Sequence, residues 1–246
     1  MFWCAFMILR ITSLDQFFSP RTLMLCIYIV ILFVGFVYFM VAARKADNAV
    51  TNRIKMGYGL FGLTYALTRF FFLLSDYEMA ISFPIYNHVT QLHLIWVTTA
   101  YSVTFVSLLV IYHTVERLIL NRKPVLTVIA AIAFMVCVIT LVLVAFNVGL
   151  DLINDTGPHQ IAKWTLYVTG PILAVGIAAL YIVIVRNSAG SVRVKSALSL
   201  IGLLLIFAGL ILDMDALSSL GIDSIRFILS PALFIVGTVV FFVAQR

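Results

Sequence analysis

Seven long apolar runs, separated by short polar segments, limit more than any other feature what this chain can fold into. About 20 apolar residues in a helix are enough to cross the ~30 Å hydrocarbon core of a bilayer. None of the runs alternates polar and apolar residues as a membrane β-strand would. Hydrophobic residues make up 63% of the chain and charged residues only 11%, whereas roughly one quarter of a soluble domain is charged. We therefore predict an all-α integral membrane protein, a seven-transmembrane-helix bundle.

The predicted spans cover about residues 22–43, 57–75, 89–113, 124–150, 161–185, 195–213 and 224–243. Ser19 and Pro20 offer an N-cap and a first-turn proline to the first span, and Pro124 opens the fourth. Residues 1–21 hold a short apolar stretch that lacks a basic n-region and a small-residue cleavage site. We expect these residues to lie on the outer leaflet as an interfacial segment, with a signal peptide as the alternative. Residues 22–246 then form the seven-helix transmembrane domain.

The distribution of charge between the spans predicts their orientation, because cationic residues are retained on the cytoplasmic side. Three alternate segments are basic, and they hold Arg44, Lys45, Arg53, Lys55, Arg117, Arg122, Lys123, Arg186, Arg193 and Lys195. The opposite segments are acidic, with Lys163 and Arg226 as the cations near that boundary. We expect the N-terminus outside, the C-terminus inside and a multi-pass location in the plasma membrane.

This topological bias also accounts for the sequence pI of about 9.4, so the basic surplus predicts no nucleic-acid binding. The expected partner is the lipid bilayer. A membrane or cytoplasmic protein partner would use the basic segments 44–56, 114–123 and 186–194.

A possible internal repeat relates the two halves of the chain. The second span ends in Asp76-Tyr77-Glu78 and the sixth in Asp213-Met214-Asp215, each after an apolar run. The same offset lays helices 1–3 over helices 5–7 and leaves helix 4 as a linker, which is the arrangement of a parallel repeat. The alternative is that two outward helix ends carry acids by chance.

This three-plus-one-plus-three plan resembles that of the sugar-transporting SWEET family, of microbial rhodopsins and, more loosely, of G-protein-coupled receptors. The resemblance covers nearly the whole chain in topology and length, and it implies a seven-helix fold with a carrier or receptor-like activity. The motifs of these families differ from this sequence. It has no Pro-Gln pair, residues 224–235 contain no lysine for a retinal Schiff base, and no Asn-Pro-x-x-Tyr ends the last span. The step His113-Thr114-Val115-Glu116-Arg117 is only distantly similar to the receptors' acid-Arg-aromatic box.

Motifs of catalysis and of cofactor binding are missing from the sequence. There is no Gly-x-Ser-x-Gly, no His-Glu-x-x-His and no phosphate-binding glycine loop. Cys4, Cys26 and Cys137 have no Cys-x-x-Cys spacing, so they predict neither a disulfide framework nor a metal site. The four histidines do not pair at the inner depth where two could ligate a haem. We expect a protein that is not an enzyme and that has no cofactor or metal.

Arg69 is the main candidate for a functional residue, because it stands seven residues before Asp76 within the second span. That position is about 10 Å below the outer boundary at 1.5 Å per residue, where an unpaired charge costs several kcal/mol. Expected partners are Asp213, His93 and Gln91, or Asp76 through a bridging water. Three roles stay open: an ion pair that locks helices together, snorkelling towards the outer headgroups, and contact with a ligand.

Two prolines inside predicted spans, Pro171 and Pro231, predict helix kinks at a similar depth. Kinked outer halves can separate and leave a polar cavity that opens outward. The alternative is an ordinary aromatic belt with prolines of no special role. The predicted ligand-binding residues are Arg69, Asp76, Gln91, His93, Trp96, Tyr167, Asp213 and Arg226.

Three functions remain compatible with this sequence. The first is a sensor or receptor-like protein in which a small ligand enters the outer cavity and Arg69 contacts it. The second is a carrier of small solutes, which the possible parallel repeat favours. The third is an accessory subunit that packs against other membrane proteins and has no cavity.

Overall fold

The computed structural model describes residues 14–213 and 223–245, and nearly all regular structure in them is helical. The helices are α1 (Leu14–Phe17), α2 (Pro20–Arg44), α3 (Ala49–Tyr86), α4 (Gln91–His113), η2 (Thr114–Ile119, a π-helix), α5 (Val125–Ala145), α6 (His159–Asn187), α7 (Gly190–Asp213) and α8 (Asp223–Ala244). The exception is an isolated backbone bridge between Asp151 and Thr156. Each of the seven predicted spans coincides with one helix from α2 to α8.

The helices extend further than hydropathy predicts, because their polar ends continue as helix beyond the apolar runs. The largest difference is α3, which has 38 residues instead of the predicted 57–75. Asn48 caps its start by accepting a hydrogen bond from the backbone N–H of Thr51 at 2.7 Å. The basic segments 44–56, 114–123 and 186–194 are therefore not open loops throughout: residues 49–56 belong to α3, and residues 190–194 belong to α7. Only the fourth span ends early, at Ala145, and it is followed by Asn147 with a φ of 57°.

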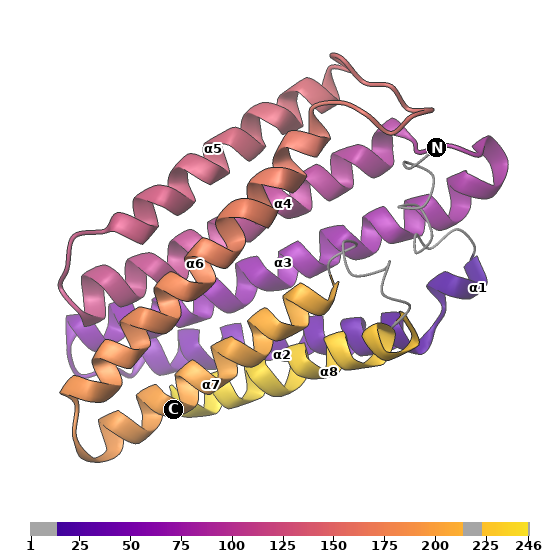
Figure 1. Cartoon of the computed structure of the whole chain (residues 1–246). Coiled ribbons are helices and arrows are strands. Elements are labelled where there is room, and N and C mark those ends of the chain that lie inside the picture. Colours follow the sequence, from indigo (N-terminus) through magenta and orange to yellow (C-terminus); the bar gives the residue numbers. More distant parts are fainter. Residues whose placement is uncertain (1–13, 214–222, 246) are drawn as a thin grey trace.

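The helices run up and down, and each packs against the next one along the chain (Figure 1). Contacts between α2 and α8 join the first and last of the long helices. Contacts between α4 and α6 cross the middle of the bundle. We call the end with Asp76, Asp155 and Asp213 the acidic end; it lies on the right of Figure 1. The opposite end, with Arg44 and Arg186, is the basic end.

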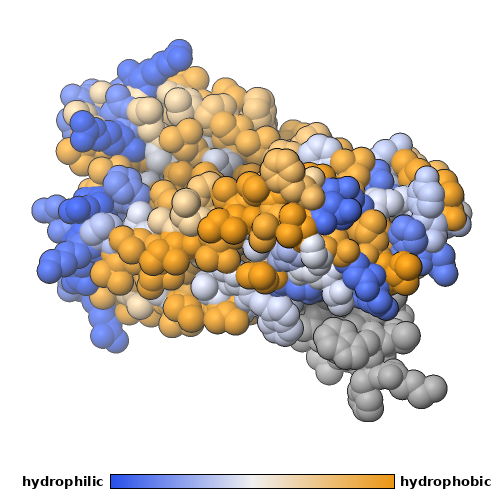
Figure 2. Space-filling view, turned by 90° about the horizontal axis from the view of Figure 1, so that it is seen from above, coloured by the Kyte–Doolittle hydropathy of each residue, from blue (hydrophilic) through white to orange (hydrophobic). Residues whose placement is uncertain are grey.

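A broad apolar surface surrounds the middle of the molecule. Valines and isoleucines on α2, α5 and α6 are more than half exposed, among them Val34 (60%), Ile132 (62%) and Val175 (71%). Figure 2 shows one face of this surface, apolar in the middle and hydrophilic towards both ends. Soluble monomers rarely expose so large an apolar patch. Six described helices are long and apolar enough to cross a membrane, and α8 adds the apolar stretch Ile228–Ala244. The chain is therefore a helical bundle suited to a membrane.

The backbones of α7 and α8 approach most closely where Gly202 faces Gly237. A Cβ atom built on Gly202 would lie 2.6 Å from the backbone nitrogen of Phe241 and 2.7 Å from the carbonyl oxygen of Gly237. One built on Gly237 would lie 2.7 Å from the carbonyl oxygen of Gly202. Because backbone atoms cannot rotate away as side chains do, only glycine fits at this crossing.

Gly202→Ala is expected to destabilise the bundle by about 2 kcal/mol, because the two helices must separate to admit the methyl group. Gly170→Ala on α6 is the matched control, since the nearest atom to its added Cβ is a leucine methyl at 3.8 Å. Thermal unfolding of both variants in the same detergent measures the difference. Equal midpoints for the two variants would contradict the close crossing.

At the basic end, Glu116 of η2 holds the start of α5. Its carboxylate is 3% exposed and accepts hydrogen bonds from the backbone N–H groups of Leu126 and Thr127, both at 2.9 Å, and from the Thr127 hydroxyl at 2.7 Å. Pro124 occupies the N-cap position and provides no side-chain hydrogen bond. Glu116 therefore replaces the usual capping residue, and its negative charge lies at the positive end of the helix dipole.

Candidate functional site

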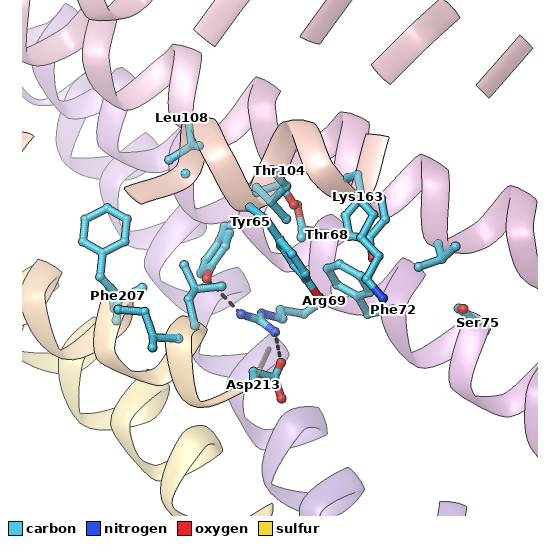
Figure 3. A pocket seen from close by; sticks show the side chains of 18 of the residues that line it. Tyr65, Thr68, Arg69, Phe72, Ser75, Thr104, Leu108, Lys163, Phe207 and Asp213 are labelled. Carbon is cyan, nitrogen blue, oxygen red and sulfur yellow. Dashed lines mark hydrogen bonds and ion pairs between the residues drawn. The ribbon is translucent and has the colours of Figure 1, made fainter. Parts of the chain in front are cut away.

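Arg69 of α3 forms the ion pair with Asp213 that the sequence predicts as one possibility. The guanidinium is 3% exposed, and its Nη1 donates to Oδ2 of Asp213 at the end of α7 over 3.0 Å. Its Nη2 donates to the hydroxyl of Tyr65, one helical turn away, also over 3.0 Å. Figure 3 shows the guanidinium between these two partners. This contact joins α3 to α7 inside the bundle.

Arg21 of α2 completes a group of four charges that the sequence did not predict. Its Nη2 donates to Oδ1 of Asp213 over 3.1 Å, and its Nη1 lies 3.5 Å from Oδ2 of Asp76. We call Arg21, Arg69, Asp76 and Asp213 the charge cluster. Its formal charges sum to zero, and it ties α2, α3 and α7 together at the acidic end. Buried ion pairs of this kind contribute little net stability, but removing one partner leaves a charge that is costly to bury.

Aromatic rings surround the part of Arg69 that the ion pair leaves open. Its Cζ lies 3.9 Å from the ring centroid of Phe234 on α8 and 5.9 Å from that of Phe72. The ring of Phe234 also stacks on Tyr28, with centroids 5.4 Å apart. Cation–π contacts of this kind stabilise a guanidinium out of water. The Nε atom of Arg69, however, is buried without a hydrogen-bond partner.

A cavity of about 250 Å³ lies beside the charge cluster. Side chains of α2, α3, α4, α6 and α7 line it. At the acidic end the wall includes Asp76 and Asp213, whose side chains keep 29% and 21% of their exposure. Further in, Phe61 and Ile177 are 4% and 1% exposed. The cavity therefore has a polar, partly exposed mouth and an apolar interior.

Five of the predicted ligand-binding residues line this cavity, namely Arg69, Asp76, His93, Tyr167 and Asp213. Pro171 of α6 lines it as well, while Pro231 lies in α8. Gln91 and Trp96 are not among the lining residues. The backbone of Arg226 belongs to α8, and its side chain lies outside what the structure describes. The proposed ligand contacts of these side chains stay predictions.

Gln91 and Trp96 make contacts that explain why they are away from the cavity. The Gln91 amide donates to the backbone carbonyls of Val144 and Ala145 over 2.9 and 3.1 Å, so it caps the end of α5. Trp96 stacks on Phe71 of α3, with centroids 5.8 Å apart. Both residues join helices. Hydropathy depth placed them near Arg69 but carries no information on which face of α4 they occupy.

His93 links α4 to α3 at the mouth of the cavity. Its Nδ1 lies 3.0 Å from the carbonyl oxygen of Ser75 and 2.9 Å from the Ser75 hydroxyl. Because a carbonyl only accepts, the contact with it requires the proton on Nδ1. This hydrogen bond holds the ring against α3 beside Asp76.

The connection between α5 and α6 carries polar groups, of which Asp155 lines the cavity. Asp151 accepts hydrogen bonds from the side chain and backbone of Asn154 and from the backbone of Ile153, and these bonds hold the pKa of the Asp151 carboxyl below its usual range. Asp155 Oδ1 lies 3.3 Å from Nε2 of His159. His159 is buried, lines the cavity, and its Nδ1 has no hydrogen-bond partner. Like the Nε of Arg69, this Nδ1 is a buried polar atom without a hydrogen-bond partner on a residue that lines the cavity.

The arrangement can bind a small molecule by hydrogen bonds at one end and apolar contact at the other. Among the described residues no group of three or more His, Cys, Asp or Glu side chains is placed to hold a metal ion. No protein-family model, curated protein or solved structure matches the chain.

Proposed function

We propose that the protein is a membrane sensor, with the acidic end and the N-terminus outside the plasma membrane and the basic end in the cytoplasm. A small ligand would enter the cavity from the acidic end and contact Arg69. One observation carries this proposal: the buried Nε of Arg69 lacks a partner while the residue lines a cavity that has a polar mouth. A group with the sole task of locking helices together is expected to satisfy its donors within the protein.

The charge cluster offers a way for occupancy of the cavity to change the helices. Asp213 holds Arg21 of α2 and Arg69 of α3 at the same time. A ligand that takes over hydrogen bonds of Arg69 would alter the balance between these contacts and so the packing of α2, α3 and α7. A ligand shifts such an equilibrium only by its differential affinity for the two arrangements.

A continuous path of packed elements leads from the cluster to the basic end. α3 has 38 residues, about 57 Å at 1.5 Å per residue, and so reaches from Arg69 to the basic segments. There Gly57 packs against the side chain of Thr114 in η2, and Glu116 of the same π-helix caps α5. Movement of α3 would thereby reach the basic surface that we propose contacts a cytoplasmic or membrane partner.

The sensor proposal is tested by thermal shifts of the purified protein in nanodiscs with a panel of carboxylates, amines, sugars and nucleosides. We expect at least one class to raise the unfolding midpoint of the wild type, since a ligand stabilises the state that binds it. Arg69→Gln should lose that shift, measured from its own midpoint, while Arg53→Gln at the exposed basic end should keep it. Shifts that are equal in both variants would contradict a role of Arg69 in binding.

A carrier of small solutes is the second candidate, and the position of the cavity favours it. The wall combines α3 and α4 from the first three-helix group with α6 and α7 from the last, which is where a carrier of parallel-repeat design binds its substrate. Uptake of the stabilising probe into proteoliposomes separates the two candidates. Accumulation inside supports a carrier, and binding without uptake supports a sensor. An accessory subunit would need no cavity at all.

A further inference from the structure

The cavity is long in the direction of the helices. On α4, beyond His93 at the mouth, the lining residues are Leu94, Val97, Tyr101, Thr104, Leu108 and Ile111. They recur every three or four positions and so form a single stripe along that helix. From Leu94 to Ile111 the stripe extends about 25 Å at 1.5 Å per residue. A volume of about 250 Å³ distributed over that length makes a narrow channel, which suits a linear molecule better than a compact one.

Polarity changes along this channel. Arg69 lies at the transition: in Figure 3, Phe207 and Leu108 lie on one side of it and Ser75 on the other. Beyond Phe207 and Leu108 the wall is mostly apolar and includes Ile111 and Ile177, both 1% exposed. The hydroxyl of Thr104, one helical turn before Leu108, already donates to the carbonyl of Ala100 at 2.8 Å. An occupant of the inner part therefore has to be a hydrocarbon.

The group that meets Arg69 has to accept a hydrogen bond. A guanidinium has only donors, and its Nε is the buried donor that the protein leaves unpaired. A protonated amine has no acceptor and cannot satisfy it, whereas a carboxylate forms the stronger, charge-assisted bond. The neighbouring carboxylate of Asp213 is compensated by two arginines, because both Arg21 and Arg69 donate to it. The electrostatic repulsion between Asp213 and a second anion at Arg69 is therefore weaker than it would be if Asp213 had no partners.

We propose that the ligand of this cavity is a single-chain amphiphile with a carboxylate head, bound with its head at Arg69 and its chain along the α4 stripe. This inference rests on the proposed ligand-binding function and names the class of its ligand. The head lies at the inner limit of the polar mouth, and the chain points towards the basic end. The hydrocarbon chain of the ligand fills the channel and makes apolar contacts with its wall.

The test measures binding of radiolabelled dodecanoate to the full-length protein in phosphatidylcholine nanodiscs, with uptake by protein-free nanodiscs subtracted. Unlabelled octanoate, decanoate, dodecanoate, dodecanol and dodecyltrimethylammonium compete against it. Burial of a methylene group contributes enough affinity for about a tenfold change with every two added carbons. We expect competition to strengthen in that order from octanoate to dodecanoate, and dodecanol and the ammonium compound to compete at least tenfold more weakly.

Arg69→Lys is the informative variant, because it keeps the positive charge beside Asp213 but removes the planar set of donors that includes Nε. We expect dodecanoate to bind it at least tenfold more weakly, while its unfolding midpoint stays close to that of the wild type. Arg53→Lys on the exposed start of α3 is the matched control and should bind as the wild type does.

Any one of four results would overturn the proposal. Competition that is independent of chain length, or equally strong for the ammonium compound, would exclude a carboxylate amphiphile. Unchanged binding to Arg69→Lys would show that the head group does not bind at Arg69. Equal uptake by nanodiscs with and without the protein would exclude this ligand class. In each case the sensor function would still be supported if another compound of the wider panel stabilised the wild type but not Arg69→Gln. Only the absence of any such compound would contradict both the sensor function and the amphiphile proposal.

Discussion

Asp213→Asn is expected to lower the stability of the bundle by about 3 kcal/mol, since removal of one partner from a buried ion pair leaves the other charge unpaired. Asp213 is the one residue of the charge cluster that contacts both Arg21 and Arg69. Its loss removes the carboxylate that the buried Arg69 and the partly buried Arg21 share. Thermal unfolding in detergent measures the effect. Asp47→Asn, at an exposed position between α2 and α3, is the control and should change little.

Combining Asp213→Asn with Arg69→Gln separates the ion pair from a general effect of either substitution. The double variant retains Arg21 and Asp76, whose charges balance. We therefore expect it to be destabilised by clearly less than the sum of the two single variants. Strict additivity would show that Arg69 and Asp213 do not stabilise one another, contrary to the 3.0 Å contact.

Ala174→Phe is expected to weaken dodecanoate binding by more than tenfold without loss of the fold. Ala174 lines the cavity from α6, so the ring occupies space that the ligand chain requires. The next residue, Val175, is 71% exposed on the apolar outer face, and Val175→Phe places the same ring outside the bundle. Binding by both variants is measured in nanodiscs. Equal affinities would show that the α6 wall does not border the binding site.

The sequence predicts the helical bundle well because membrane solvation imposes a simple rule on the chain. Backbone polar groups in a bilayer have to bond within the helix, so about 20 apolar residues identify a span almost alone. Helix ends are harder to predict, because hydropathy does not detect polar residues that are helical. Residues 49–56 form the start of α3 after the Asn48 cap, outside the apolar run.

The candidate site is predicted only in part, because depth in a helix can be counted from the sequence but the face of the helix cannot. Depth correctly predicts the contact of Arg69 with Asp213. It also predicts Gln91 as a partner of Arg69, although Gln91 caps α5 instead. Arg21 was missed because it follows Pro20 at a predicted boundary and was assigned to the flanking segment. One signal was available: a cation in the first turn opposes the helix dipole and therefore calls for an acidic partner nearby.

The proposed sensor requires the cavity beside Arg69 to open to water at the acidic end. Thiol labelling tests it most directly, in sealed vesicles and in a background with Cys4, Cys26 and Cys137 replaced by alanine. Val97→Cys lines the cavity, and Ile139→Cys at a similar distance from the acidic end faces outward at 56% exposure. A thiol reacts as the thiolate, which requires water.

We predict that a small, impermeant, anionic thiol reagent added on the side of the acidic end modifies Val97→Cys, that dodecanoate slows the reaction, and that Ile139→Cys stays unmodified. Failure of Val97→Cys to react from that side would mean a dry, filled bundle at the depth of Arg69. That result would contradict both the cavity and the sensor built on it.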